Sequence, residues 1–342
     1  MKSLTERIRT DLTAKILSGI YPPGGKLPTE RDYAKQSGVS RVTVRRVYDQ
    51  LERSGIIVRR RPLGTRVSDT FRAHGGPLES IGLITTLPHT FSGQFVEAVS
   101  RRCEELDALL VLGIPEPDTG ERQLEIALRM ASRGVRDLIV WGADRGFDFS
   151  VFERLRILGV NLVFYDQVIP GPFADYVGLD NAGAMRLLLE QAVRDGAQEF
   201  FFITYSDLDV DTNAERRNAF ETFSHPAVRR REVRAIRRDA PNSDWRRLGA
   251  ELARRTEENG GHTAILAVNA PVLLRLFSAP PQGGRLYCVD SAPELSSLGA
   301  TGCGQPIREM AEAAVEALQN QRKKGGEWKA EIRRFPGRLV IP

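Results

Sequence analysis

Short apolar runs alternate with helical segments over most of the chain, from residue 81 onward. The apolar runs are residues 81–85, 109–112, 137–141, 161–165, 199–204, 263–268 and 285–289. Segments of helical periodicity lie between most of them, for example 94–106, 123–133, 181–194 and 213–223. Repeated alternation of strand and helix predicts parallel sheets with helices on both faces. We therefore expect an α/β fold for this part of the chain.

The first 68 residues follow a different pattern, in which three helices precede a hairpin. An apolar stripe at four-residue spacing from Leu4 to Ile16 predicts the first helix. Thr29 is a good N-cap for a short second helix, which Gly38 can close, and Ser40 can cap a third. Helices two and three, with the tight turn between them, are typical of a helix-turn-helix.

A basic hairpin follows the third helix. Residues 56–61 end in three arginines, and residues 65–67 follow a Pro-Leu-Gly turn. Two short strands around such a turn indicate a β-hairpin with a basic edge. Three helices and this hairpin together predict a winged helix-turn-helix.

The charge of the chain is concentrated in this head. The 342 residues carry a net charge of +5, but residues 1–72 hold 16 Lys and Arg against 7 Asp and Glu, which is +9. The remaining residues therefore sum to −4. A basic head on a mildly acidic body predicts a polyanion-binding module beside a separate second domain. The alternative is a solvated basic face without a partner.

Four motifs in the head resemble GntR-type regulators. They are residues 19–31 (GIYPPGGKLPTER), 39–45 (VSRVTVR), 51–57 (LERSGII) and 64–67 (GTRV). The resemblance covers about residues 4–68 and implies binding to double-stranded DNA. One departure is the wing tip, where Pro62-Leu63 replaces the usual Gly-rich turn. A winged helix used only for protein contacts is the alternative.

The resemblance also implies which side chains contact DNA. Side chains at the N-terminus of a recognition helix reach base edges in the major groove, and Arg can pair bidentately with guanine. The expected DNA-binding residues are Arg31, Ser40, Arg41, Thr43, Arg45, Arg46, Arg61, Leu63 and Gly64.

Motifs in the body resemble the effector domain of LacI/GalR-type repressors, which is built like a type I periplasmic sugar-binding protein. They are residues 176–181 (YVGLDN), 216–220 (RRNAF), 264–269 (AILAVN), 288–290 (CVD) and 305–310 (QPIREM), in this order. The resemblance spans about residues 80–342 and implies two subdomains, each with a parallel α/β sheet, that clamp a small ligand in the cleft between them.

This organisation gives the expected domain boundaries. Residues 1–68 form the DNA-binding domain, and residues 69–79, which are polar and contain Gly75-Gly76-Pro77, form a linker. Residues 80–342 form the ligand-binding and dimerisation domain. Its N-subdomain takes about 80–168 and 304–327, and its C-subdomain takes about 169–303 and 328–342.

Candidate ligand residues follow the apolar runs, because ligands of parallel α/β sheets bind beyond the carboxyl ends of the strands. The LacI resemblance adds an arginine in the helix after residue 204 and aromatic pocket walls. A sugar needs hydrogen-bonding groups of fixed geometry and an aromatic face. The expected ligand-binding residues are Phe91, Trp141, Asp166, Tyr205, Asp207, Arg216, Asn269, Asp290 and Gln305.

Two departures from the family bear on the ligand. Ala270-Pro271 follows Asn269 where the family has Asp, and Gln167 follows Asp166 where the family has Arg.

Structural alternatives remain open for several of these residues. Asp166 and Asp290 could cap helices or pair at the crossovers, and Arg216 could be a surface arginine. Trp141 could belong to the core. Residues 207–211 could form a solvated acidic loop, and the basic runs 229–231 and 237–238 a solvated surface.

The sequence argues against catalysis. Its four histidines are isolated, and it contains no HExxH, GxSxG or P-loop motif. Lysine is scarce after residue 35, which excludes a Schiff-base lysine on a strand-end loop. Three scattered cysteines fit neither a disulfide framework nor a zinc site. We expect no enzyme activity, no cofactor and no metal.

The expected cellular setting is the cytoplasm. No apolar run reaches the length of a membrane span, and the N-terminus is charged and lacks an apolar signal core. We expect no membrane contact.

Together these features predict a DNA-binding transcriptional regulator. It would be a homodimeric repressor that reads an inverted-repeat operator and that a small effector releases when it closes the body. Because the arabinose-responsive branch joins a GntR-type head to a LacI-type body, a sugar is the expected effector. The alternatives are a nucleoside or purine-like effector, and effector-independent DNA binding.

Overall fold

The computed structural model describes residues 4–17, 20–22, 24–53, 56–60, 62–68, 77–86, 90–143, 147 and 149–342. The chain divides into two compact units, each described by itself below. Unit 1 comprises residues 1–177 and 311–333, and unit 2 comprises residues 178–310 and 334–342. No helix in the described ranges is both long and apolar enough to cross a membrane.

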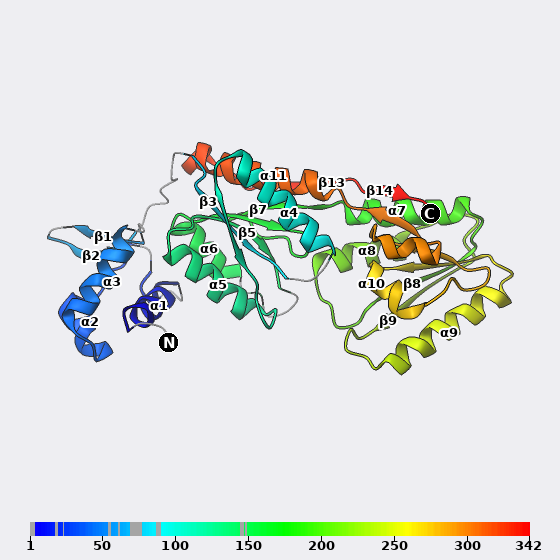
Figure 1. The fold of residues 1–342 in the computed structure, drawn as a ribbon, viewed down its shortest axis with the longest axis horizontal. Coiled ribbons are helices and arrows are strands. Elements are labelled where there is room, and N and C mark those ends of the chain that lie inside the picture. Colours follow the sequence, from blue (N-terminus) through cyan, green and yellow to red (C-terminus); the bar gives the residue numbers. More distant parts are fainter. Residues whose placement is uncertain are drawn as a thin grey trace. The chain divides into compact units, whose positions relative to one another are not determined.

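The head of unit 1 contains three helices and one hairpin (Figure 1). The helices are α1 (Leu4–Leu17), α2 (Glu30–Ser37) and α3 (Arg41–Arg53). Strands β1 (Ile57–Arg60) and β2 (Gly64–Val67) pair antiparallel, with Ile57 opposite Val67. The expected winged helix-turn-helix is therefore present.

Local signals set the ends of these helices. The Thr29 hydroxyl accepts a hydrogen bond from the Asp32 amide at the start of α2. Gly38 ends that helix in the left-handed region, at φ 65°, where a residue without a Cβ is favoured. The core behind α3 holds Val44, Val47, Tyr48 and Leu51, all buried.

The rest of unit 1 is built around a six-stranded sheet of order β13-β7-β6-β5-β3-β4. Its strands are β3 (Ser80–Ile84), β4 (Leu109–Gly113), β5 (Asp137–Trp141), β6 (Asn161–Tyr165), β7 (Asp175–Leu179) and β13 (Ile332–Phe335). The strands from β7 to β4 run parallel. Helices α4 (Thr90–Glu105) and α11 (Ile307–Lys324) lie on one face, and α5 (Gly120–Ser132) and α6 (Phe149–Ile157) lie on the other (Figure 1).

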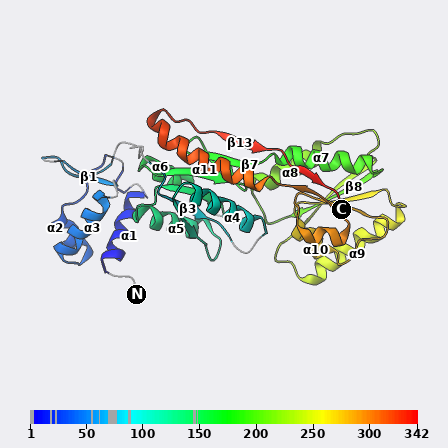
Figure 2. The ribbon, with the colours of Figure 1, turned by 45° about the horizontal axis from the view of Figure 1, so that its top comes forward.

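Unit 2 contains a second six-stranded sheet, of order β14-β12-β11-β10-β8-β9. Its strands are β8 (Glu199–Tyr205), β9 (Arg230–Ile236), β10 (Thr263–Ala267), β11 (Arg285–Cys288), β12 (Thr301–Gly304) and β14 (Arg338–Val340). Only β14 pairs antiparallel in the described sheet. Helices α7 (Asn181–Arg194) and α8 (Asp211–Thr222) cover one face, and α9 (Asn242–Glu258) and α10 (Ala270–Leu276) cover the other (Figure 2). A short 3-10 helix spans Pro293–Leu298, and another, Gly325–Glu327, belongs to unit 1.

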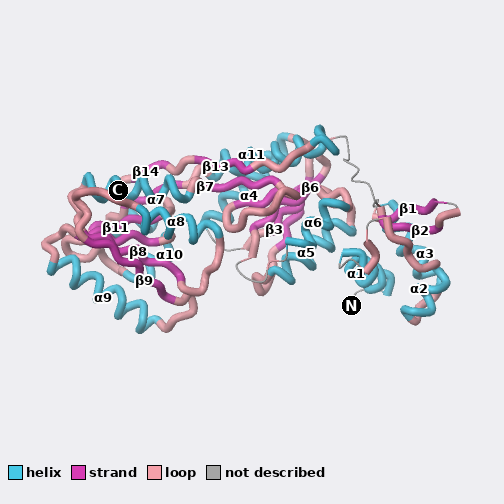
Figure 3. Tube along the Cα trace, turned by 180° about the vertical axis from the view of Figure 1, so that it is seen from behind, coloured by secondary structure: helices cyan, strands magenta, loops and turns pink. Residues whose placement is uncertain are grey.

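Each sheet thus lies between two layers of helices (Figure 3). The α/β fold with two mostly parallel sheets is confirmed. The connections explain the layers, because right-handed crossovers in opposite directions along a sheet place helices on opposite faces. All the expected strands are present, with ends within one residue of their expected positions.

Five strands were not expected from the apolar runs, namely β7, β9, β12, β13 and β14. Strand β9 reads RREVRAI and was expected to begin in a solvated basic run. It lies at the edge of its sheet, where charged side chains can reach water while the backbone pairs with β8. Because β9 is rich in charged residues, a search for apolar runs does not find it.

Candidate DNA interface and ligand site

The first turn of α3 is held together by the residues expected to contact DNA. The Ser40 hydroxyl accepts a hydrogen bond from the Thr43 amide at 3.1 Å, and the two hydroxyls lie 2.9 Å apart. Ser40 therefore caps the helix, as expected, and fixes the position of Thr43. Both groups lie at the helix N-terminus, where backbone N–H groups also favour a phosphate.

Four arginines around this turn are exposed. They are Arg31 on α2 and Arg41, Arg45 and Arg46 on α3. Only Arg41 has a described ion-pair partner among these four, Glu30 at 3.4 Å, and its side chain stays 71% exposed. The surface therefore presents several guanidinium groups to solvent, as binding to a polyanion requires.

The wing is fastened to α3 by Arg59. Its guanidinium lies 2.7 Å from Asp49 and 2.8 Å from Glu52, both on α3. The wing tip presents exposed Leu63 and then Gly64, whose φ of 82° needs glycine. The turn therefore keeps the one glycine that its geometry requires. Arg61 lies outside the described residues.

In the body part of unit 1, the expected aromatic residues form a cluster at the carboxyl ends of β5 and β6. Trp141 contacts Phe91 and Tyr165 edge-on, with ring centroids 5.2 and 5.3 Å away. Phe95 stacks on Tyr165 at 3.9 Å. Trp141 is only 7% exposed, so most of its side chain is part of the core, as the alternative interpretation held. Phe91 is half-buried.

Polar atoms beside this cluster are buried without a described partner. The indole N–H of Trp141 and the side-chain oxygen of Gln167 form no hydrogen bond with the described residues. Buried polar atoms are nearly always satisfied by protein, water or a ligand. Between them in the sequence, Asp166 adopts a left-handed φ of 63°, which is uncommon for a residue other than glycine and frequent at functional sites.

Arg216 in unit 2 is buried and fixed by two hydrogen bonds. Its Nε donates to Asn181 Oδ1 at 2.8 Å, and its Nη1 donates to the Val268 carbonyl at 2.7 Å. The side chain thus lies across the ends of α7 and β10. The interpretation as a surface arginine is wrong, because the residue is 7% exposed. Sequence reasoning missed Asn181, although it belongs to the YVGLDN motif.

Three further expected residues meet at the carboxyl ends of β8, β10 and β11. The Tyr205 hydroxyl donates to Asn269 Oδ1 at 3.4 Å. Asn269 also caps α10, since the same oxygen accepts from the Val272 amide at 3.3 Å. Asp290 accepts a hydrogen bond from the Ala270 amide at 3.0 Å, so the capping role left open for it is present.

The Ala270-Pro271 departure fits this helix start. Pro271 stands in the first turn of α10, where its missing N–H has no partner to lose.

The Asp207 side chain is only 9% exposed, although it lies in the loop between β8 and α8. It accepts hydrogen bonds from the Arg238 amide at 3.0 Å and from the Arg238 Nε at 3.3 Å. Burial pushes the pKa of the Asp207 carboxyl upward, but the amide and guanidinium of Arg238 outweigh burial and hold it below its usual value. Burial raises the pKa of Tyr205 nearby.

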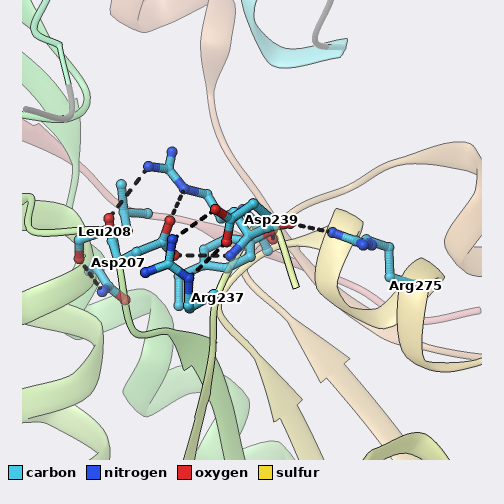
Figure 4. Close-up of polar contacts among 9 residues, drawn as sticks. Asp207, Leu208, Arg237, Asp239 and Arg275 are labelled. Carbon is cyan, nitrogen blue, oxygen red and sulfur yellow. Dashed lines mark hydrogen bonds and ion pairs between the residues drawn. The ribbon is translucent and has the colours of Figure 1, made fainter. Parts of the chain in front are cut away.

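The loop after β9 is clamped by a second arginine (Figure 4). Arg275 on α10 donates to the carbonyls of Arg238 at 2.6 Å and of Ala240 at 3.3 Å. Its guanidinium also lies over the Trp245 ring, 4.2 Å from the centroid. The neighbouring Arg237 forms an ion pair with Asp239 at 2.7 Å.

Gln305 lies at the carboxyl end of β12, the strand that pairs parallel with β11. Its side-chain oxygen is buried without a described partner. Among the described residues, no group of three or more His, Cys, Asp or Glu side chains could hold a metal ion.

Comparison with known proteins agrees with the two parts of the chain. Residues 4–67 match the family of bacterial regulatory proteins called gntR. The HTH-type transcriptional regulator Rv0792c of Mycobacterium tuberculosis is 34% identical over 164 residues, which cover 44% of this chain and 60% of that protein. The match therefore spans less than two thirds of this relative. Residues 4–67 are a GntR-type helix-turn-helix domain.

Solved structures resemble the body. A LacI transcriptional regulator from Lactobacillus brevis superposes with a TM-score of 0.64 at 19% identity, over 77% of this chain and 100% of that chain. A LacI family regulator from Enterococcus faecium with bound ribose gives a TM-score of 0.59 at 16% identity, over 77% and 97%. The body has the fold of LacI-type regulators and periplasmic binding proteins.

Proposed function

We propose that this chain, which joins a GntR-type head to a LacI-like body, is a transcriptional repressor that a sugar releases from its operator. The observation that carries the proposal is that one chain contains both a surface suited to DNA, at the start of α3, and a cluster of polar side chains at the carboxyl ends of strands, where ligands of such sheets bind. The head offers Ser40, Thr43 and Arg45 to DNA. The body offers Arg216, Asn269 and Asp290 to a small ligand.

A sugar is the effector class that these groups suit. Sugar hydroxyls both donate and accept hydrogen bonds, and the apolar face of a sugar ring packs on aromatic rings. Unit 1 supplies Trp141 with Phe91 and a buried N–H without a described partner. Unit 2 supplies a fixed guanidinium and carboxamide. The ribose bound by one LacI-type neighbour supports the same class.

We also propose that the chain acts as a homodimer. Strand β4 is an edge strand of the unit 1 sheet, and it exposes Leu109 (73%), Leu112 (43%) and the adjacent Ile114 (46%). An apolar sheet edge of this kind is a favourable contact for a second copy. Two heads carried by a two-fold dimer would match an inverted-repeat operator. Leu109→Asp should shift the chain to monomer in sedimentation velocity, and an unchanged dimer would reject this surface.

The effector class can be tested by thermal shift with a panel of L-arabinose, D-ribose, D-xylose, D-galactose, adenosine and inosine. We expect a sugar to raise the Tm, because a ligand that binds only the folded state stabilises it. The same sugar should weaken binding to the inverted-repeat DNA that the wild-type chain selects from a random pool.

The panel also separates the alternatives. A shift with the nucleosides alone would favour a flat ring between the aromatic groups around Trp141. Specific DNA binding with no shift by any compound would favour effector-independent binding. The absence of DNA binding would reject the proposed function as a whole.

A further inference from the structure

A buried polar network lies at the amino ends of β5, β6 and β7 in unit 1, at the opposite edge from the aromatic cluster. Asp137 is fully buried and receives the Arg322 guanidinium, with Nη2 at 2.6 Å and Nε at 3.0 Å. Asp137 also accepts from Asn161 Nδ2 at 2.8 Å. The network is fully connected, which is the condition under which buried charges are tolerated.

The network continues from Asn161 to Asp175. Arg156 donates to Asn161 Oδ1 at 2.7 Å and to Gln321 Oε1 at 2.5 Å. Gln321 Nε2 in turn donates to Asp175 Oδ2 at 2.6 Å. The Glu331 amide donates to the other oxygen of Asp175 at 2.8 Å.

Every segment that connects the two units starts or ends in this network. The chain passes between the units after residues 177, 310 and 333, which lie in β7, α11 and β13. Asp175 is the first residue of β7, Arg322 lies in the last turn of α11, and Glu331 directly precedes β13. A shift in any of these segments therefore acts on the same set of hydrogen bonds.

Arg322 also contacts the end of the linker. Its Nη1 donates to the Pro77 carbonyl at 3.0 Å, three residues before β3 begins. The side chain is only 12% exposed, so its planar guanidinium is held between Asp137 and Pro77. A lysine could keep the positive charge beside Asp137, but its single ammonium group cannot reproduce the geometry of a guanidinium that donates to Asp137 and Pro77 at once.

We propose that Arg322 is a positioning residue for the linker, because it ties the Pro77 carbonyl at the end of the linker to the network that holds the ends of the segments connecting the two units. Its role in regulation rests on the proposed function, because it gives effector binding a route to the linker. None of the described hydrogen bonds of Arg322 reaches the expected DNA-binding or ligand-binding residues.

The test compares Arg322→Lys with Arg156→Lys in the full chain. Arg156 is buried in the same network and donates to Asn161 and Gln321, but none of its described hydrogen bonds reaches the linker. Both variants remove a guanidinium from the network, and of their described hydrogen bonds only those of Arg322 include the contact with Pro77. This pair separates a positioning role from a merely structural one.

The first readout needs no effector. Hydrogen exchange of the amides of residues 78–80 should be about fivefold faster in Arg322→Lys than in wild type, because a charged hydrogen bond is lost. Arg156→Lys should exchange at the wild-type rate in this segment. Equal exchange in both variants, whether raised or unchanged, would overturn the proposal.

The second readout is the ratio of operator Kd values with and without the panel sugar that most raises the wild-type Tm. Couplings of this kind are about 5- to 150-fold. Arg322→Lys should lower the ratio at least about fivefold, with sugar affinity within about twofold of wild type. An unchanged ratio would overturn its regulatory role. A wild-type chain that no sugar affects would instead reject the proposed function, and the exchange measurement would still decide whether Arg322 holds the linker.

Discussion

The head and unit 2 use the same residue type in opposite environments. Arg45 on α3 is exposed at the N-terminus of a helix, whereas Arg216 on α8 is buried and fixed by two hydrogen bonds. The head presents its charge to solvent until a polyanion displaces the water. In unit 2, by contrast, the guanidinium of Arg216 is already hydrogen-bonded to the backbone carbonyl of Val268 without a ligand.

This difference separates two ways of building a binding site. Binding to a phosphate backbone depends on charge near a surface, so its side chains need little support from the fold. Recognition of a small polar ligand depends on groups fixed in advance, so its side chains are also part of the core. Substitutions of the exposed arginines should therefore affect binding alone in the head, whereas substitution of Arg216 should affect stability as well in unit 2.

The largest expected effect is that of Arg216→Ala on stability. It should lower the free energy of unfolding by about 3 kcal/mol, because Asn181 Oδ1 and the Val268 carbonyl lose a buried donor. Urea unfolding measures the change. The matched control is Arg217→Ala, an exposed neighbour paired with Glu221, which should change stability by less than about 0.5 kcal/mol. A similar loss of unfolding free energy in both variants would contradict the proposed difference between buried and exposed arginines.

Arg45→Ala should act on DNA binding and not on stability. Loss of a base-reading arginine should weaken operator binding by about 10- to 100-fold, equivalent to about 1–3 kcal/mol. Its unfolding free energy should stay within about 0.5 kcal/mol of wild type, because the side chain is exposed. Arg101→Ala on α4 is the control for loss of an exposed charge. Wild-type affinity of Arg45→Ala in a mobility-shift assay would remove Arg45 from the interface.

Asp207→Asn should destabilise unit 2 in a pH-dependent way. The hydrogen bonds from Arg238 hold the pKa of Asp207 below its usual value, so the pair stabilises the fold when Asp207 is ionised. Its contribution is complete above a pH of about 4 and is lost as the pH falls through the lowered pKa. We expect a difference of about 1 kcal/mol at pH 7, since Arg238 is partly exposed. Unfolding free energies measured from pH 7 down to pH 3 should show the difference shrinking, and a constant difference would assign it to packing.

The smallest expected effect is that of Leu63→Ala at the wing tip. Operator affinity should change by about twofold, because Leu63 is exposed and carries no charge. Gly64→Ala is the informative partner variant. It should destabilise the hairpin by about 1 kcal/mol, since alanine is strained at a φ of 82°. A large loss of affinity in Leu63→Ala would show that the tip inserts into the DNA.

Prediction from the sequence was most complete where the structure is local. The cap at Thr29, the left-handed Gly38 and the cap at Ser40 each depend on residues within three or four positions. The apolar strands were also found, and β5, β6 and β10 among them are buried on both faces. Strand β9 was missed because its edge position permits charged residues.

The candidate ligand residues show a different limit. Their place beyond the strand ends follows from the α/β pattern, and Tyr205, Asn269 and Asp290 do meet there. Their hydrogen-bond partners could not be predicted. Asp207 was expected to bind the ligand, with a solvated acidic loop as the alternative, but its partner Arg238 is 31 residues away in the chain.

The sequence by itself determined the type of head, the class of the body and the exposed arginines of α3, because helix caps, turns and alternating periodicity act over a few residues. Only the tertiary structure decided which arginines are buried and what they hold. Arg216 joins residues 181 and 268, and Arg322 joins residues 137 and 77. Such contacts depend on the packing of distant segments around a sheet, and no local pattern in the chain specifies them.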